Sequence, residues 1–560
     1  MSSVSKVLKD DGARRDAISL HDRSILVEAG AGSGKTAVMA GRIAAMLAEG
    51  VAPRSIAAVT FTELAASELL SRVREFVADL SAGTIATELR VALPDGLSQT
   101  HRDNLAAASA AIDEITCSTI HGFCQRLIKP YPAEADIDPG AGVMDRNQAD
   151  LTFLEIVDGW LRERLSGGQG GILAELVLHS PGETVALIHK IAENMRRRPT
   201  LTAPLVSPLG GHLTAFRQAT ADFANFMDGT AAAEPETVMI VERLAEMATA
   251  VANGPDPATS AGLVRLLTAR PHPDLCTKAG AFASYRKKGK WAATAKQDGL
   301  SKADGDRLND AAETHYTACC DAWVALAQAV AGHALAALID EARPILQRYR
   351  DHKRASAQLD FDDLIFAARD LLRDHDDVRR ALGQRFAHVL VDEFQDTDPL
   401  QTEIFWRLCG EPVDGADGWT GFRIRPGALF LVGDPKQAIY RFRGADVGAY
   451  VQARDAFRDQ DPGSLLSIST NFRSCASILT FVNERFEVAL SAGGQPGFTA
   501  LDPFHDDRGG LCVAALDIAV ADENGKASAE QQRDAEADAI ADLCARLIES
   551  HPIIDRRSGA

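Results

Sequence analysis

HVLVDEFQDTDPLQ, residues 388–401, is the stretch that decides the fold class of this chain. Val389, Leu390 and Val391 end an apolar run, which predicts a buried parallel strand. Asp392 and Glu393 follow at the carboxyl edge of that strand, where open α/β sheets bind ligands. A site that hydrolyses a nucleotide needs such a pair, because one carboxylate holds Mg²⁺ and the other positions the attacking water. Since an acidic pair after a strand is usually only the start of a loop, this interpretation requires a phosphate-binding loop elsewhere in the chain.

A phosphate loop is predicted near the N-terminus. Residues 25–29, ILVEA, form a short apolar run that predicts a strand, and residues 37–47 have a helical pattern. Between them lies AGAGSGKT, so the order of strand, glycine-rich loop and helix is that of a P-loop. We expect the following residues to bind nucleotide phosphates: Ala29, Gly30, Ala31, Gly32, Ser33, Gly34, Lys35 and Thr36.

Together the two motifs predict a site for ATP and Mg²⁺. Lys35 would reach the β- and γ-phosphates, and Thr36 and Asp392 would hold the metal ion. The strict loop pattern begins with glycine, whereas this chain has Ala29 there. Taken alone, the loop could be a turn that binds no nucleotide, but the DEFQD strand argues against that alternative.

Composition indicates an ordinary globular protein of several domains. The chain has 560 residues, 46% of them hydrophobic and 24% charged, enough for about three to four domains. No apolar run approaches the ~20 residues that span a membrane, and the N-terminus lacks the apolar core of a signal peptide. Nine scattered cysteines without a CxxC pair indicate reduced thiols, so we expect a cytoplasmic protein. A net charge of −19 argues against a nucleic-acid coat protein but permits a local basic groove.

The pattern along the chain predicts an α/β lobe interrupted by a helical insertion. Residues 20–130 alternate apolar strands with helical stretches, and residues 135–350 are rich in alanine and leucine at helical spacing. The α/β pattern returns near residue 386 and includes a strand at 428–432. A strand at 511–516 and a helix at 529–548 are predicted in the last region.

Further motifs place polar side chains at predicted strand ends. In VTFTELAASELLSRV, Phe61 and Thr62 end a strand, and Thr62 is a candidate N-cap. In STIHGFC, His121 is equally consistent with a structural hydrogen-bonding role and with a functional one. In GDPKQAIYRFRGAD, Gln437 lies where it could sense the γ-phosphate. In TNFRS, Arg473 could touch the γ-phosphate from outside the P-loop lobe.

Clusters of aromatic and basic residues are candidates for nucleic-acid contact. Tyr440 and Phe442 alternate with arginines, which favours base stacking, although a core stripe is the alternative. YRKKGKW, residues 285–291, is evenly balanced between nucleic-acid contact and a structural role. The three arginines at 196–198 are typical of a helix C-terminus, and DFDDL at 360–364 is typical of an acidic helix start.

Six elements in this order resemble the UvrD/Rep-type helicases of superfamily one: AGAGSGKT, TFTELAASELLSRV, STIHGFC, VDEFQD, GDPKQAIYRFRGA and TNFRS. The resemblance covers about residues 22 to 480, and STIHGFC, YPAEADIDP and LDFDDL are closer to the AddA/RecB branch of helicase–nuclease subunits. It implies an α/β fold: a RecA-like P-loop NTPase lobe with a large helical insertion and the start of a second RecA-like lobe. The implied segments are 1–130 and 351–470 for the first lobe, 131–350 for the insertion and 471–560 for the second lobe.

The resemblance also implies roles for individual residues. Lys35 and Thr36 bind phosphates and Mg²⁺, Asp392 and Glu393 handle Mg²⁺ and the hydrolytic water, and Gln437 and Arg473 sense the γ-phosphate. The side chains lining the path of single-stranded DNA would be Phe61, Thr62, His121, Tyr440 and Phe442. The implied activity is ATP-driven 3′→5′ movement along single-stranded DNA in double-strand break repair. The implied partners are duplex DNA and a second, AddB-like subunit.

Three departures from the family pattern bear on this expectation. Arg14 stands where the family has an adenine-reading glutamine, and Leu64 stands where it has a lysine. The family's later motifs and the branch's nuclease domain do not occur in these 560 residues, so we expect a fragment of a longer protein. The alternatives are a module that binds ATP and DNA without competent hydrolysis, and a motor that moves on RNA.

Overall fold

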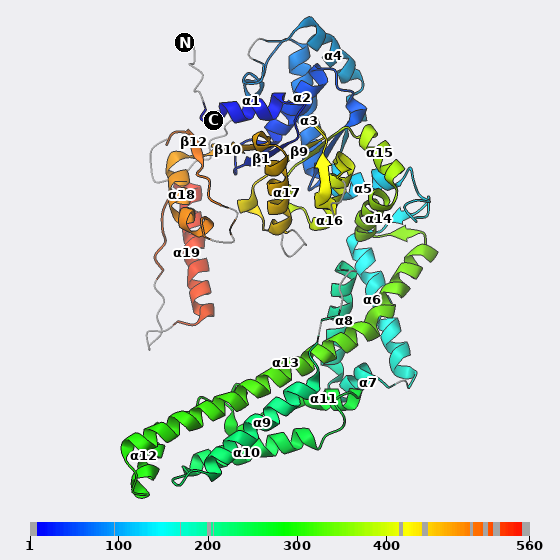
Figure 1. Cartoon of the computed structure of the whole chain (residues 1–560). Helices are drawn as coiled ribbons and strands as arrows, with labels where there is room; N and C mark the ends of the chain where they lie inside the picture. Colours follow the sequence, from blue (N-terminus) through cyan, green and yellow to red (C-terminus); the bar gives the residue numbers. More distant parts are fainter. Residues whose placement is uncertain are drawn as a thin grey trace. The chain divides into compact units, whose positions relative to one another are not determined.

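Six parallel strands form the sheet that carries the motifs, in the order β10-β1-β9-β6-β2-β3. Their bounds are β1 Ile25–Ala29, β2 Ile56–Thr60, β3 Thr116–Thr119, β6 His388–Val391, β9 Leu429–Gly433 and β10 Leu465–Ile468. Figure 1 labels β10, β1 and β9 of this sheet. The strands predicted at 25–29 and before DEFQD are confirmed, and the one predicted at 428–432 lies one residue further on. Leu26 pairs with both Leu465 and Leu431, so residues more than 400 positions apart become neighbours.

This computed structural model describes residues 8–93, 96–168, 170–198, 203–204, 206–413, 418–439, 446–492, 495, 497–507, 513–518 and 527–550. The chain divides into two compact units. Unit 1 comprises residues 1–131 and 368–560 and contains the six-stranded sheet. Unit 2 comprises residues 132–367 and consists mainly of helices. The whole is therefore a mixed α/β chain with a parallel sheet and many helices.

Helices cover both faces of the sheet because its strands are apolar on both sides. Alternate residues of β1, Ile25 and Val27, belong to one buried cluster with α2 Lys35–Ala48 and α3 Glu63–Ser81. Helices α16 and α17 contact β6, β1 and β10. The helices of unit 1 are α1 Asp11–Ser19, α2, α3, α4 Gln99–Ala110, α5 Ile120–Ile128, α15 Asp376–Arg385, α16 Pro399–Cys409, α17 Val447–Gln460, α18 Ala476–Leu490 and α19 Ala529–Ser550, and α14 Phe361–Asp374 crosses the unit boundary.

The remaining strands of the described residues form small two-stranded sheets. They pair β11 Thr470–Cys475 with β12 Asp502–His505, β7 Gly410–Pro412 with β8 Phe422–Ile424, and β4 Gly142–Val143 with β5 Gln358–Leu359. The strand predicted at 511–516 is wrong where it can be checked, because residues 513–518 have no regular structure. The helix predicted at 529–548 is confirmed as α19.

Unit 2 is organised along one 54-residue helix, α13 Lys302–Ala355. Its other helices are α6 Arg146–Ser166, α7 Ile172–His179, α8 Pro181–Arg197, α9 Leu209–Asp228, α10 Pro235–Ala252, α11 Ser260–Thr268 and α12 Lys288–Gln297. Figure 1 shows α9 running beside α13, which it contacts along its length. Buried residues of α13 recur every three or four positions: Gly305, Asn309, Ala312, Tyr316, Cys319, Trp323, Leu326 and Val330.

By length and apolar composition, α13 is also the one helix in the described part of the chain that could span a membrane. Its buried apolar residues from Ala312 to Tyr349, however, belong to the apolar cluster that α13 shares with α6, α8, α9 and α10. Spacing of three and four places these residues on one face, as in a coiled-coil seam. We therefore interpret α13 as the core helix of unit 2.

Candidate functional site

The loop between β1 and α2 forms a cradle suited to phosphate groups. Gly32 and Gly34 adopt left-handed backbone angles, with φ of 69° and 83°, which residues with a side chain adopt only with strain. No side chain among the described residues caps the N-terminus of α2, so the positive end of its dipole faces the loop. The hydroxyl oxygen of Ser33 is buried and has no hydrogen-bond partner among these residues. The loop thus offers donors that an anion would satisfy.

The acidic pair at the end of β6 meets the lysine of this loop. Lys35 Nζ forms an ion pair with Glu393 Oε2. Glu393 has φ 49° and ψ 44°, a left-handed conformation that is unfavourable for a residue other than glycine. Its amide N–H donates to Asp392 Oδ1 at 2.9 Å. Two motifs 358 residues apart in sequence are therefore in contact, and the backbone is strained at their meeting point.

The carboxyl groups of Asp392, Glu393 and Asp396 affect one another electrostatically at this edge of the sheet. Burial raises the pKa of Asp392 to about 6, the charge of Glu393 contributes to the rise, and Lys35 opposes it. Burial and Glu393 likewise raise the pKa of Asp396 to about 6. A divalent cation would offset this repulsion between carboxylates.

The residues present fit Mg²⁺ bound together with a nucleotide. No group of three or more histidine, cysteine, aspartate or glutamate side chains that could hold a metal ion occurs among the described residues. Magnesium at phosphate sites takes only one or two protein ligands and completes its shell with phosphate oxygens and water. Asp392 at the end of β6 and Thr36 in the first turn of α2 are the candidate ligands.

A hydrogen-bonded chain links Glu393 to the predicted sensor Gln437. Gln395 Nε2 donates to Glu393 Oε2 at 2.8 Å, and Gln395 Oε1 accepts from the backbone N–H of Asp434 at 2.8 Å. Gln437 Nε2 in turn donates to Asp434 Oδ2 at 2.7 Å. The ends of β6 and β9 are thus coupled through Gln395 and Asp434. Sequence reasoning missed both connecting residues, although each lies within two or three residues of a predicted site residue.

Strand β11 lies directly against the phosphate loop. Asn471 Nδ2 donates to Ala31 O at 2.5 Å, and the backbone N–H of Phe472 donates to Gly32 O at 2.8 Å. A Cβ at Gly32 would lie 2.7 Å from Arg473 Cβ, so only glycine fits there. Arg473 therefore lies beside the loop, while its contact with a γ-phosphate stays a prediction. Asn471 is a further contact that the sequence did not reveal.

The structure also places Arg14, which stands at the expected adenine-reading position. It is 7% exposed, and its Nη1 donates to Ser33 O at 2.9 Å. Its Nε donates to Asp10 Oδ1 at 3.0 Å. Nothing in the motif pattern indicated that this side chain reaches the phosphate loop.

The predicted nucleic-acid residues lie at the ends of β2 and β3 where they are described. Phe61 is 37% exposed, and Thr62 caps α3 by accepting from Ala65 N at 3.1 Å, as predicted. His121 lies in the first turn of α5, and burial lowers its pKa, which favours the neutral imidazole. Tyr440 and Phe442 fall outside the described residues.

The basic cluster YRKKGKW is built into unit 2. Tyr285 and Trp291 are buried, and the Tyr285 hydroxyl accepts from Trp291 Nε1 at 2.7 Å. Lys287 and Lys290 both form ion pairs with Glu236. The aromatic rings and two of the four cations therefore have structural partners, which favours the structural alternative for this segment.

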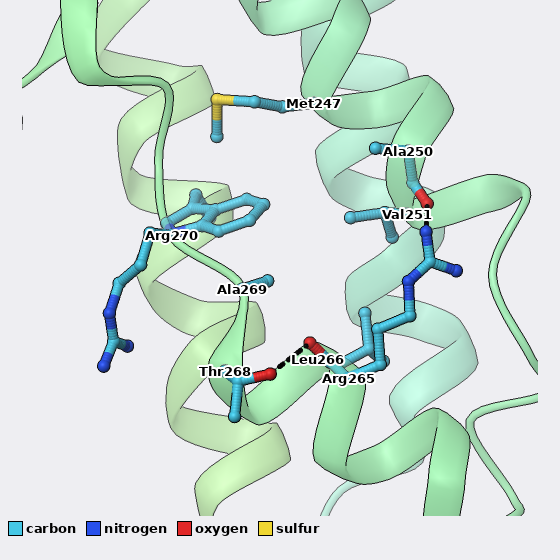
Figure 2. A pocket seen from close by; sticks show the side chains of 9 residues that line it. Met247, Ala250, Val251, Arg265, Leu266, Thr268, Ala269 and Arg270 are labelled. Atoms are coloured by element: carbon cyan, nitrogen blue, oxygen red, sulfur yellow. Dashed lines mark hydrogen bonds between the residues drawn. The ribbon is translucent and has the colours of Figure 1, made fainter. Parts of the chain in front are cut away.

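A separate pocket of about 230 Å³ lies in unit 2 (Figure 2). Its described walls come from α10, α11, the segment after α11, and α13: Met247, Ala250, Val251, Arg265, Leu266, Thr268, Ala269, Arg270 and Trp323. None of these side chains is a carboxylate, a histidine or a thiol. The pocket therefore lacks groups for metal-assisted or acid–base chemistry.

Comparison with known proteins adds a family match. The model of the UvrD/REP helicase N-terminal domain matches residues 11–458. The chain is 26% identical over 517 residues to the AddA subunit of the ATP-dependent helicase/nuclease from Natranaerobius thermophilus, covering 85% of this chain and 37% of that protein. The protein of the same name from Moorella thermoacetica is 29% identical, and the match covers 85% of this chain and 34% of that protein. Exonuclease/helicase subunit RexA of Lactococcus lactis subsp. cremoris is 23% identical, and the match covers 85% of this chain and 40% of that protein. The chain spans two fifths or less of the length of these relatives.

Proposed function

Because this chain belongs to the UvrD/REP helicase N-terminal domain family, we propose that it is the ATP-hydrolysing motor part of a DNA helicase, and that its sheet is a RecA-like lobe. The single observation that carries the proposal is the contact between Lys35 and Glu393. It brings the phosphate loop and the acidic pair into one site, beside an uncapped helix N-terminus. This combination suits phosphoryl transfer, where catalysis rests on positioning and charge stabilisation.

The proposed mechanism assigns one task to each side chain. Lys35 exchanges the Glu393 carboxylate for β- and γ-phosphate oxygens when the nucleotide enters, which frees Glu393 to orient a water molecule. Asp392 and Thr36 would hold Mg²⁺, which would supply positive charge to the phosphates. Gln395 orients the Glu393 carboxylate by donating from its Nε2 to Glu393 Oε2 at 2.8 Å. Through Asp434 it also connects Glu393 with Gln437.

The position of β11 supports a role for Arg473 in sensing the γ-phosphate. Its Cβ lies against Gly32 of the loop, and Asn471 and Phe472 join this strand to loop carbonyls. A nucleotide that reshapes the loop would therefore also move β11. This coupling is what a motor needs to convert hydrolysis into displacement.

We further propose that single-stranded DNA runs over the carboxyl ends of β2 and β3, past Phe61, Thr62 and His121, and on to Tyr440 and Phe442. The exposure of Phe61 supports base stacking, which is sequence-tolerant. The names of the relatives refer to one subunit of a helicase/nuclease. The word subunit supports a partner, which we propose to be a second, AddB-like subunit. A cytoplasmic role in double-strand break repair and movement in the 3′→5′ direction are proposed from the resemblance of the motifs alone.

The test is Mg·ATP hydrolysis with and without single-stranded DNA, with single-stranded RNA as a parallel arm. Stimulation by DNA that disappears in Lys35→Ala supports the proposal. Binding of Mg·ATP without turnover would leave a nucleotide-binding module, and unchanged ATP affinity in Lys35→Ala would refute the assigned site. Displacement of streptavidin from 3′- and 5′-biotinylated oligonucleotides then tests the direction of movement.

A further inference from the structure

Arg14 is fully engaged with the protein itself. Its Nε and Nη2 donate to the Asp10 carboxylate at 3.0 and 3.1 Å, a bidentate pair in which both residues are 7% exposed. Nη1 donates to Ser33 O at 2.9 Å, and Nη2 also donates to Thr470 O at 3.2 Å. The guanidinium lies 5.0 Å from the centre of the Phe472 ring. One side chain thus touches α1, the phosphate loop and β11.

Asp10 anchors the other half of this connection. Its Oδ2 accepts from the backbone N–H groups of Ser469 and Thr470 at 3.0 and 2.9 Å, and Oδ1 accepts from Thr470 Oγ1 at 2.8 Å. The carboxylate is therefore held at the corner where β10 ends and β11 begins. Because Asp10 is fixed there, it fixes the orientation of the Arg14 guanidinium in turn.

Three consecutive carbonyls of the phosphate loop are held from one side. Ala31 O accepts from Asn471, Gly32 O from the Phe472 backbone and Ser33 O from Arg14. In a planar trans peptide the N–H of the next residue points away from the carbonyl. Fixing the carbonyls of residues 31 and 33 therefore directs the N–H groups of Gly32 and Gly34 to the opposite side, as a phosphate cradle requires.

The geometry points to Arg14 as a positioning residue for the triphosphate chain and not as a reader of the base. This inference rests on the proposed function, since it assumes that the loop binds a nucleotide. A guanidinium carries only donors, whereas the adenine edge pairs with a side chain that offers both a donor and an acceptor. The donors of Arg14 are directed at Asp10 and at two backbone carbonyls, one of them in the loop. Loss of Arg14 should therefore weaken the binding of every triphosphate by the same factor.

The experiment measures equilibrium binding of Mg·ATPγS, Mg·GTPγS and Mg·tripolyphosphate to the full chain and to Arg14→Gln. We expect all three dissociation constants to rise together by about tenfold, the factor that corresponds to the loss of one charge-assisted hydrogen bond. Arg14→Lys keeps the charge but not the fork geometry, so we expect a smaller and again uniform rise. If Arg14→Gln does not fold, the dissociation constants of Arg14→Lys test the inference in its place.

Arg15→Gln is the matched control, because Arg15 is on the same helix, is exposed and pairs only with Asp16 among the described residues. Its dissociation constants should equal those of the unaltered chain. A rise for ATPγS alone, or no rise in either Arg14 variant, would overturn the inference. If the unaltered chain itself bound no nucleotide, or if Lys35→Ala bound as well as it, the proposed function would fail instead.

Discussion

Asp392→Asn should stabilise the ligand-free protein while removing its response to Mg·ATP. Burial and the neighbouring Glu393 raise the pKa of Asp392 from 3.8 to about 6. A carboxyl group with a raised pKa binds its proton more tightly in the folded state, so folding loses stability as pH rises from below 4 to above 6. At pH 7.5 Asp392 is ionised in both states, so the whole loss of stability applies. The difference between a pKa of 3.8 and one of about 6 corresponds to about 3 kcal/mol of unfolding free energy. Asparagine cannot ionise, and its oxygen can still accept from the Glu393 N–H.

The assay is thermal unfolding at pH 7.5 with and without Mg·ATPγS. Ligand at 100 times its dissociation constant should add about 2.7 kcal/mol to the unaltered chain and far less to Asp392→Asn. In the unaltered chain this gain should shrink as pH falls below 6, because a proton must leave Asp392 before the cation binds. Asp396→Asn is the matched control, since Asp396 also has a pKa of about 6 but is not a proposed metal ligand. Asp396→Asn should keep the stability that Mg·ATPγS adds to the unaltered chain. A ligand-free Asp392→Asn protein that unfolds at a lower temperature, or that responds fully to Mg·ATPγS, would refute the reasoning.

Three further substitutions test the site and its supports. Glu393→Gln should retain ATPγS binding but hydrolyse ATP about 10²- to 10⁴-fold more slowly, and turnover near the original rate would remove Glu393 from the mechanism. Arg42→Met should lower the unfolding free energy by about 3 kcal/mol, because Arg42 is 2% exposed and donates to three backbone carbonyls at and beyond the end of α1. Denaturant titration measures this loss, and an unchanged midpoint would contradict it. Tyr285→Phe should cost about 1 to 3 kcal/mol by leaving Thr237 and Trp291 without their shared hydroxyl partner, yet leave single-stranded DNA affinity unchanged at every salt concentration. A lower affinity of Tyr285→Phe for single-stranded DNA would restore the nucleic-acid interpretation of that segment.

The elements that sequence predicted best are those with a local signal. The runs at 25–29 and 388–391 are each apolar at all but one position, as expected of strands covered on both faces. The glycine-rich loop lies between a predicted strand and a predicted helix, which is the order of a P-loop. Their proximity followed from topology, since parallel strands bring their carboxyl ends to one edge of the sheet.

Contacts between distant segments could not be predicted in the same way. The bond from Arg14 to Thr470 joins residues 456 positions apart and depends on β10 lying beside β1. The left-handed backbone of Glu393 depends on its surroundings and not on its residue type. In YRKKGKW, composition alone does not separate stacking aromatics from buried ones, because tyrosine and tryptophan suit both environments.

The strand order also determines when the protein can fold during synthesis. β1 pairs with β9 on one side and with β10 on the other, so the pairing of Leu26 is complete only once Leu465 has been synthesised. At about 5 to 20 residues per second, the ribosome reaches that partner roughly 20 to 90 s later. Over that interval β1 has apolar side chains and two open edges, a hazard that a nascent chain meets by binding chaperones. Unit 2 is synthesised within this interval and has its own apolar core, so its folding can precede completion of the sheet. The nucleotide site is thus among the last parts of the described chain to form, since β11 closes the phosphate loop.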